Sequence, residues 1–400
     1  MKSNDENICL LNYWWAANYG ANLTAYALYN LLLLENKIPL MVKNEDELQL
    51  MHEQESTFNK NFAKNFFKTT DTHNSFSSLS SLNKISKTFI VGSDQVFRAV
   101  LSKQCLNSRL LDFTDIDAKR IAFSASFGGD KKQFINETSP EVIEKMKMAL
   151  QTFSFVSVRE KAGVEICKDV FNIDAKLIID PVFIIDKEKY SELIASTATH
   201  CYNEKVISFL FHQTINNYKG EKVWSIHQKD ISIGEWLKAI RDCKLLITDS
   251  FHAMCFAIIF NKPFIVFVNQ ETGISRYETI LEILGIENQC IYSKDELERR
   301  DCVFKIDYNR VNEKIKEEAE KGKSFLRTAI ATEITVTPQM MKSREMFLRY
   351  IIIEKEKELN LKFQITKALW YAWVNCFHRY LPESIKNVIR TMRSVIRCKL

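Results

Sequence analysis

A short apolar run at Leu245–Thr248 leads directly into Asp249, Ser250 and His252, and a second apolar run with helical character follows. Free backbone N–H groups and the helix dipole at such a turn favour an anion. Ser250 can cap the helix and also contact the anion. His252 falls in the first helical turn, where it would face a cleft with a pKa range suited to proton transfer. The alternative is a capped helix with a packed histidine.

A second polar segment follows the strand predicted at 89–91. Gly92 permits a tight exit from this strand, and Asp94 and Gln95 would then face the same crevice. Asp94 could accept a hydroxyl proton or orient an acceptor molecule. The alternative is an Asx-turn, in which the Asp94 side chain bonds to nearby backbone.

Two arginines are candidates for binding a phosphate group. Arg159 follows the strand predicted at 155–158, where its guanidinium can reach into a cleft as a bidentate fork. The alternative is a pair between Arg159 and a neighbouring acid. Arg276 opens an amphipathic helix and is a further candidate. Asp180 is expected only to end a strand, which is a structural role.

These side chains lie at the ends of short apolar runs that alternate with helical patterns, which is typical of parallel α/β architecture. The predicted strands are 8–13, 89–91, 120–124, 155–158, 177–179, 206–211, 245–248 and 264–268, and the predicted helices among them include 18–35, 233–243 and 253–260. The polar stretch 45–84 is expected to be a short helix plus loop. A boundary near Ile185 would give two α/β domains with a cleft between them and active groups at the carboxyl ends of strands.

Beyond about residue 309 the pattern is wholly helical. Helices are expected at 309–331, 339–361 and 363–380, and Pro382 opens a last one. The segment 362–400 carries eight basic residues against the single acid Glu383, and the basic stripe of the last helix consists of Lys386, Arg390, Arg393 and Arg397. A basic amphipathic helix suits an anionic membrane surface. The alternative is a helix packed back across the two domains.

Composition restricts the class of protein. The 400 residues suggest two or three domains, and 55 Lys+Arg against 50 Asp+Glu leave a net charge of +5, too small a surplus for a dedicated nucleic-acid binder. The N-terminus does not have the pattern of a signal peptide, and no apolar run reaches the roughly 18 residues of a spanning helix. The 10 cysteines form no CxxC pair and are expected to be reduced thiols. We therefore expect a cytoplasmic protein.

Several short segments in a fixed order carry a resemblance to a known family. The segments NYGANL, VGSDQVF, AFSASFG, SVRE, IDPVF and TDSFHAMCFAIIFNKPFIV together resemble the polysaccharide pyruvyl transferase family over roughly residues 8 to 290. The resemblance implies transfer of a pyruvyl group from phosphoenolpyruvate onto sugar hydroxyls of a cell-surface polysaccharide or its lipid-linked precursor, leaving a ketal. It also implies a fold similar to the GT-B glycosyltransferases, with two Rossmann-like domains, here 1–185 and 186–335, facing a cleft, and a helical extension at 336–400.

The resemblance also assigns roles to the candidate residues. The family's catalytic histidine maps onto His252 and a phosphate-binding arginine onto Arg159, although Ala253 stands where members often carry glycine. His252 would donate a proton, and Ser250 and Arg276 would help to bind the donor. The acceptor-binding side chains are expected to be Asp94, Gln95 and Asn18. No metal and no cofactor is expected, because phosphoenolpyruvate is itself a substrate.

Three further expectations concern partners and alternatives. The acceptor would be a glycan or lipid-linked sugar, reached by peripheral contact with the inner face of the plasma membrane, and no nucleic acid would be bound. One alternative function is a GT-B glycosyltransferase that uses a nucleotide sugar and binds a nucleoside diphosphate. Another is a non-catalytic scaffold of a polysaccharide assembly complex, in which His252 can be replaced without effect.

Overall fold

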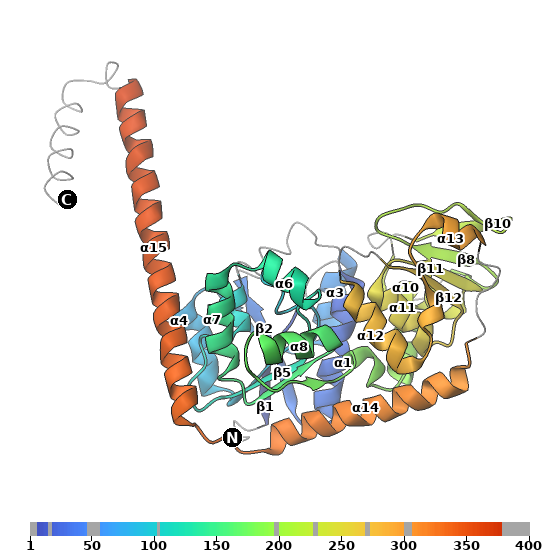
Figure 1. Ribbon diagram of the computed structural model, residues 1–400, viewed down its shortest axis with the longest axis horizontal. Helices are drawn as coiled ribbons and strands as arrows, with labels where there is room; N and C mark the ends of the chain where they lie inside the picture. The colour runs from blue at the N-terminus through green and yellow to red at the C-terminus, as the bar shows by residue number, and fades with distance from the viewer. Residues whose placement is uncertain are drawn as a thin grey trace, which may run out of the picture. The chain divides into compact units, whose positions relative to one another are not determined.

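The apolar runs predicted as strands form two sheets, which Figure 1 shows side by side. The computed structural model describes residues 6–14, 18–45, 57–101, 105–195, 200–226, 231–268, 273–299 and 306–377. Residues up to Glu345 form one compact unit, which contains both sheets, and a second unit starts at Met346. The predicted domain limits at residues 185 and 335 stay predictions.

The first sheet is entirely parallel, with strand order β3-β2-β1-β4-β5-β6-β7. Its strands are β1 (Asn7–Leu11), β2 (Ile38–Asn44), β3 (Thr69–His73), β4 (Thr88–Val91), β5 (Lys119–Ala125), β6 (Phe155–Val158) and β7 (Lys176–Leu177). Its α-helices are α1 (Tyr19–Leu34), α3 (Thr57–Phe66), α4 (Phe76–Ser80), α5 (Leu106–Arg109), α6 (Lys131–Glu137), α7 (Pro140–Leu150) and α8 (Lys161–Asp169), with 3-10 helices η1 (Ser81–Lys84) and η2 (Pro181–Phe183). Strands β1 and β4 lie in the centre of the sheet and are buried on both faces, which explains their largely apolar sequences.

The second sheet has strand order β13-β12-β11-β8-β10-β9 and is parallel except for the pair β9 and β10. Its strands are β8 (Val206–Phe209), β9 (Asn217–Tyr218), β10 (Glu221–Ser225), β11 (Leu245–Thr248), β12 (Phe264–Phe267) and β13 (Cys290–Ile291). Its helices are α9 (Glu188–Ala195), α10 (Ile233–Asp242), α11 (Phe251–Ile259), α12 (Ile274–Leu284) and α13 (Lys294–Arg299), with the 3-10 helix η3 (Glu287–Gln289).

Each sheet reverses its strand order at one place, and the candidate residues gather there. In the first sheet the chain moves outward from β1 through β2 to β3 and then returns to β4 on the other side of β1. In the second sheet β8 plays the part of β1, with β10 on one side and β11 on the other. Loops leaving the carboxyl ends of adjacent strands diverge at such a point and open a crevice for a ligand.

A continuous apolar core joins the two sheets. Helices α1 and α11 contact each other, and both are buried along nearly their whole length. Such helices are apolar on every side because no face of them meets water. The same core cluster includes Ile8 of the first sheet and Val266 of the second. The two halves are therefore packed together as one body.

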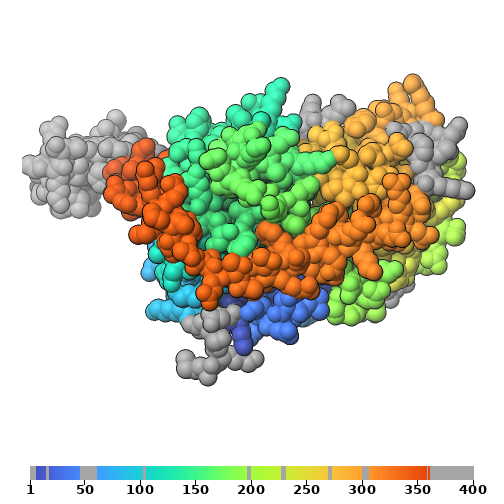
Figure 2. Space-filling model, turned by 60° about the horizontal axis from the view of Figure 1, so that its bottom comes forward, coloured from blue at the N-terminus to red at the C-terminus, as the bar shows by residue number. Residues whose placement is uncertain are grey.

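Helix α14 (Tyr308–Ala331) runs across both halves, as Figure 2 shows. Near its start, Tyr308 donates a hydrogen bond to the carbonyl of Lys262, which precedes β12. Near its end, the ring of Phe325 contacts Phe123 of β5, with 6.1 Å between centroids. Gly322 lies so close to η2 that a Cβ atom there would be 2.5 Å from Ile184 Cδ1. The helix therefore fastens the second sheet to the first.

The predicted fold class, α/β with a helical C-terminal region, is confirmed, but three segments differ from prediction. The stretch 45–84 contains strand β3, whose polar sequence TTDTH suits the exposed edge of a sheet. The hairpin of β9 and β10 was not predicted. It turns at Lys219 and Gly220, where both φ angles are positive (49° and 82°), as a tight hairpin turn requires.

The third difference is in the C-terminal helices. Residues 338–377 form one helix, α15 (Pro338–Phe377), in place of the two predicted there. No glycine or proline interrupts the sequence after Pro338 in this helix, so nothing in it favours a break. Among the described helices, none combines the length and apolar character needed to cross a membrane. The last predicted helix, with its basic stripe, lies outside the described residues.

Candidate active site

A cavity of about 210 Å³ lies where the carboxyl ends of the two sheets meet. It brings together six of the seven candidate side chains: Asn18, Asp94, Gln95, Ser250, His252 and Arg276. The other lining residues are Phe211, His212, Asp249, Phe251, Phe267 and Tyr277. Arg159 is not among them. We call this space the central cavity.

The first sheet contributes Asn18 and Asp94 from its point of strand reversal. Asn18 caps α1 by accepting a hydrogen bond from the backbone N–H of Ala21 at 3.2 Å, so the N-terminus of this helix is directed at the cavity. Gly92 approaches Phe123 so closely that a Cβ atom would lie 2.3 Å from that residue's carbonyl oxygen. Asp94 follows with φ of 68°, a conformation that aspartate tolerates better than most residues.

The segment after β11 is fixed by its own side chains. The Thr248 hydroxyl donates to the carbonyl of Phe209 at 2.6 Å and accepts from the N–H of Ser250 at 3.0 Å. The Asp249 carboxylate accepts from the N–H groups of Phe211 and His212 at 2.9–3.1 Å. Ser250 caps α11, as predicted, by accepting from the N–H of Ala253. The loops after β8 and β11 are thus tied to each other.

His252 is held between helix α1 and the start of η2. Its Nε2 atom lies 3.0 Å from the Thr24 hydroxyl and 3.6 Å from Asp180 Oδ2. Its ring packs against Gly20, where a Cβ atom would lie only 2.1 Å from Nδ1. His252 as a whole is 7% exposed, and it lines the central cavity. Neither Thr24 nor Gly20 was singled out by the sequence analysis.

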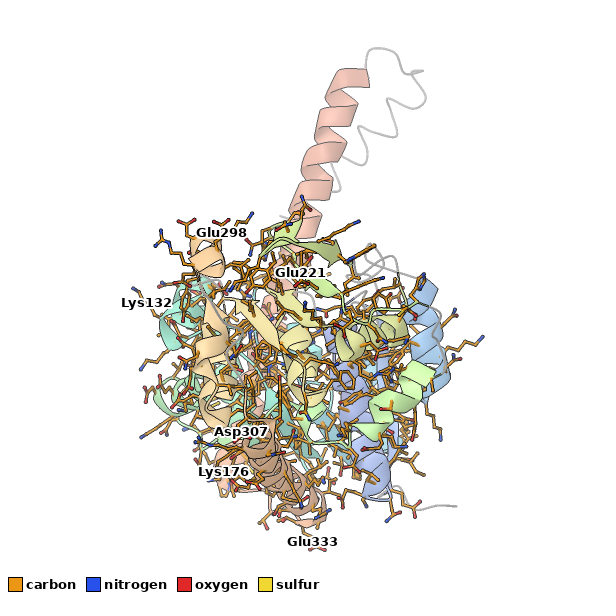
Figure 3. All side chains as sticks on the ribbon, turned by 90° about the vertical axis from the view of Figure 1, so that its right-hand side faces the viewer. Lys132, Lys176, Glu221, Glu298, Asp307 and Glu333 are labelled. Atoms are coloured by element: carbon orange, nitrogen blue, oxygen red, sulfur yellow. The ribbon has the colours of Figure 1, made fainter. Side chains whose placement is uncertain are left out.

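The structure places Arg159 differently from the prediction. Its guanidinium is buried, lying 2.7 Å from Asp94 Oδ1, 2.5 Å from Asp180 Oδ2 and 3.9 Å from Glu160 Oε2. It pairs with acids, which was the alternative, because three carboxylates converge on it from separate strand ends. In contrast to the buried Arg159, the charged side chains of Lys132, Glu298 and Glu333 point outward from the surface, as Figure 3 shows.

The charge of Arg159 keeps two carboxylates ionised. Burial alone raises the pKa of Asp180, but Arg159 and His252 outweigh it and lower that pKa to about 2. For Asp94 the same opposition between burial and the charges of Arg159, His252 and Arg276 ends in a lowered pKa. The pKa of Glu160 is raised instead, because the effect of its burial outweighs that of the nearby Arg159 charge. Asp94 therefore enters the cavity as a carboxylate.

Arg276 is the cation that faces the central cavity. It lies at the start of α12 and donates weakly to the carbonyl of Gly273 at 3.4 Å. No carboxylate of the described residues is within ion-pair distance of it. Burial, together with the positive charge of Arg159, lowers its pKa. The ring of Phe251 contacts both guanidinium groups, with the Arg159 and Arg276 Cζ atoms 5.0 Å and 5.5 Å from its centroid.

Some residues of the site were missed, and the reasons differ. Asp180 was noted but taken as a strand terminator, which it also is, since it accepts from the N–H of Val182 at 3.1 Å. Thr24 lies within an apolar helix and no local pattern marks it, because its partner His252 is 228 residues away in the sequence. Phe211 follows a strand and resembles a core residue in the sequence, yet it is 54% exposed.

The chain matches one family model and is distantly similar to several solved structures. The family model for polysaccharide pyruvyl transferase matches residues 18–271. A search among curated proteins found no match. A Klebsiella pneumoniae protein of uncharacterised function has 12% identity and a TM-score of 0.40, over 72% of this chain and 93% of that one. UDP-GlcNAc 2-epimerase from Neisseria meningitidis has 9% identity and a TM-score of 0.44, over 86% and 98%. An α-glucosyltransferase has 8% identity and a TM-score of 0.43, over 86% and 99%.

The fold and the site together place this chain among proteins built of two α/β halves, with a polar cavity where the strand ends of the two halves meet. Because the family model covers more than half of the chain, this chain belongs to the polysaccharide pyruvyl transferase family. The structural likenesses are too distant to support an argument about activity.

The first prediction concerns the buried charges around Arg159. Because the pKa values of Asp94 and Asp180 are lowered, their stabilising contribution is present above the ordinary pKa of an aspartate and is lost as pH falls through the lowered values, which for Asp180 is about 2. Arg159→Met leaves both carboxylates buried without their cation, so we expect a loss of about 3–5 kcal/mol at pH 7. Their pKa values then rise, and the variant should become more stable as pH is lowered from 8 to about 5.

Urea unfolding at several pH values measures this effect. The control is Lys161→Met, which removes an exposed pair with Glu282 and should cost no more than about 1 kcal/mol. An Arg159→Met variant whose stability follows the wild-type pH profile would contradict the role given to these ion pairs.

The second prediction concerns Gly20. In an open helix position, glycine to alanine would stabilise the protein by up to about 1 kcal/mol. Here the added methyl group meets the His252 ring, so Gly20→Ala should lower the melting temperature and shift the imidazole NMR signals of His252. Signals from His73, which lies elsewhere, should not move. A more stable variant with unchanged His252 signals would show that the two residues are not in contact.

Proposed function

We propose that the central cavity binds phosphoenolpyruvate and that the protein transfers its pyruvyl group to two hydroxyls of a sugar, forming a ketal. The acceptor belongs to a cell-surface polysaccharide or its lipid-linked precursor. The observation that supports this most is a single cavity that combines a histidine, an ionised carboxylate and an arginine that forms no ion pair with any acid of the described residues. Family membership points to the same reaction.

Two groups support the binding of the anionic donor. Arg276 supplies a positive charge, and the N-terminus of α11 supplies backbone N–H groups and a favourable dipole. The Ser250 hydroxyl accepts from the backbone and retains its own proton for donation to a donor oxygen. Arg159 acts from behind the cavity by fixing Asp94 and Asp180.

His252 is the group proposed to move protons. As an imidazolium it donates Nε2–H to the Thr24 hydroxyl, and Asp180 Oδ2 lies 3.6 Å from the same nitrogen. Nδ1 makes no hydrogen bond to a described residue, so its proton is the one available for the substrate. Transfer of that proton to the methylene carbon of phosphoenolpyruvate leaves a cationic C2, which a sugar hydroxyl attacks.

The remaining steps balance the reaction. Once deprotonated, His252 accepts the proton of the attacking hydroxyl, because the lowered pKa of Asp94 makes that carboxylate a weak base. Asp94 instead orients the hydroxyl through its Oδ2 atom, which makes no hydrogen bond to a described residue. The C2–O bond to phosphate then breaks, and the second sugar hydroxyl closes the ketal, its proton leaving with the phosphate.

Membrane contact is a separate part of the proposal. The basic sequence at 362–400 would hold the protein at an anionic leaflet on the cytoplasmic side, where a lipid-linked acceptor is presented. No metal or cofactor is required by the scheme.

The third prediction tests donor binding. Phosphoenolpyruvate should raise the melting temperature of the purified full chain by mass action. Arg276→Met removes charge-assisted hydrogen bonds worth about 1.5–3 kcal/mol, so it should weaken binding roughly 10- to 100-fold. Lys161→Met is the control for loss of a surface cation and should bind as the wild type does. Stabilisation by a nucleotide sugar, with no response to phosphoenolpyruvate, would favour the glycosyltransferase alternative.

The fourth prediction tests proton transfer. Purified protein incubated with phosphoenolpyruvate and candidate lipid-linked sugars should release phosphate. His252→Gln keeps a polar side chain of similar reach and should leave donor binding intact, but it should lower turnover by at least roughly 10²-fold. Full activity in a folded variant would remove His252 from the mechanism, and a wild type without turnover on any acceptor would favour the scaffold alternative.

A further inference from the structure

A second cavity of about 360 Å³ adjoins the central cavity at the carboxyl ends of β8 and β10. The two cavities share Phe211 and His212 as common wall residues. The rest of the second cavity is lined mainly by uncharged polar side chains, among them Ser208, Gln213, Thr214 and Ser225. None of these was a candidate in the sequence analysis. We call this space the lateral cavity.

The position of the lateral cavity follows from the sheet topology. Strand β8 is the point where the second sheet reverses its order, so the loops after β8 and β11 diverge there. The loop after β11 turns towards His252, and the loop after β8 carries residues 210–214. A ligand at the carboxyl ends of β8 and β10 therefore lies in the crevice where α/β sheets bind ligands.

The wall between the two cavities is rigidly held. The Asp249 carboxylate binds the backbone N–H groups of Phe211 and His212, and the Phe211 ring makes an edge contact with Phe209, with centroids 5.2 Å apart. At the far end of the loop, the Lys294 ammonium lies 3.4 Å from the carbonyl of Thr214. Phe211 nevertheless leaves 54% of its surface exposed, so the ring is presented as a fixed platform.

The chemistry of the walls selects the kind of ligand. Among the described residues, no lysine, arginine, aspartate or glutamate lines the lateral cavity, so these walls offer a diphosphate no charged side chain of those types. An exposed aromatic ring beside several hydroxyl and amide groups instead matches a pyranose. The C–H face of such a ring packs on the aromatic surface, and its hydroxyls bond to the polar side chains.

We propose that the lateral cavity binds a pyranose ring of the acceptor, packed against Phe211. This inference rests on the proposed function, because it assigns the acceptor of that reaction to a place. A sugar seated there reaches past Phe211 and His212 into the central cavity, where its hydroxyls meet Asp94 and His252. The six predicted residues that line the central cavity then serve the donor and the reacting hydroxyls, and the residues after β8 recognise the sugar.

The test measures sugar binding apart from turnover. The probes are methyl glycosides of common hexoses and N-acetylhexosamines, followed by saturation-transfer NMR on the full chain, with and without phosphoenolpyruvate. We expect at least one glycoside to bind the wild type. Phe211→Ala and Gln213→Ala should each weaken that binding about tenfold, which corresponds to about 1.4 kcal/mol. Phe211→Tyr, which keeps the ring, should bind as the wild type does.

The matched control is Trp224→Ala. Trp224 is an aromatic residue of β10 that is 42% exposed and stacks with Lys205 and Lys222 without lining the lateral cavity. Its replacement should leave glycoside binding unchanged. Equal losses from Trp224→Ala and Phe211→Ala would overturn the inference, because binding would then depend on exposed rings in general.

Two further outcomes separate this inference from the proposed function. If phosphoenolpyruvate raises the melting temperature but no glycoside binds, or if uridine diphosphate binds in place of glycosides, the lateral cavity is not the acceptor site. If a glycoside binds through Phe211 and Gln213 but phosphoenolpyruvate has no effect, the sugar site stands and the donor assignment fails.

Discussion

The buried ion pairs of Arg159 organise the edge of the first sheet that faces the central cavity. One guanidinium joins Asp94, which follows β4, to Asp180, which follows β7, while Arg159 itself follows β6. Three strand ends are thus fixed by a single charge. Because the pairs are buried, water does not weaken them, and both acids stay ionised. The carboxylate that enters the central cavity and the one beside His252 are both positioned in this way.

The same arrangement explains why two arginines of one site have different tasks. Arg159 is buried among acids and does not line the central cavity. Arg276 has no acidic partner among the described residues, and its charge is available to an anion. The Phe251 ring lies near both guanidinium groups, with the Arg159 and Arg276 Cζ atoms 5.0 Å and 5.5 Å from its centroid. The different roles of the two arginines depend on where the acids lie and could not be predicted from the arginines alone.

Local sequence patterns identified much of the site because the ends of parallel strands are recognisable. Ser250 could be predicted since helix caps and strand ends have distinct residue preferences. The sequence offered a neighbouring acid as an alternative partner of Arg159, but Asp94 and Asp180 could not be predicted as its partners, because they are 65 and 21 residues away and meet it only through the sheet order. The contacts of His252 with Gly20 and Thr24 depend on packing between the two halves, which leaves no local pattern. The helical break predicted near residue 362 was wrong, because a change of composition is not a helix stop.

The joined core has a consequence for how substrates enter. Helices α1 and α11 bury their side chains against each other and against both sheets, and α14 spans the two halves. Swinging the halves apart would expose these side chains to water at roughly 1.5–3 kcal/mol for each large apolar residue. Opening by a hinge is therefore unfavourable, and the way in and out is through the loops at the strand ends. The halves act as a single frame, and the space for a ligand is set by the few loops at its rim.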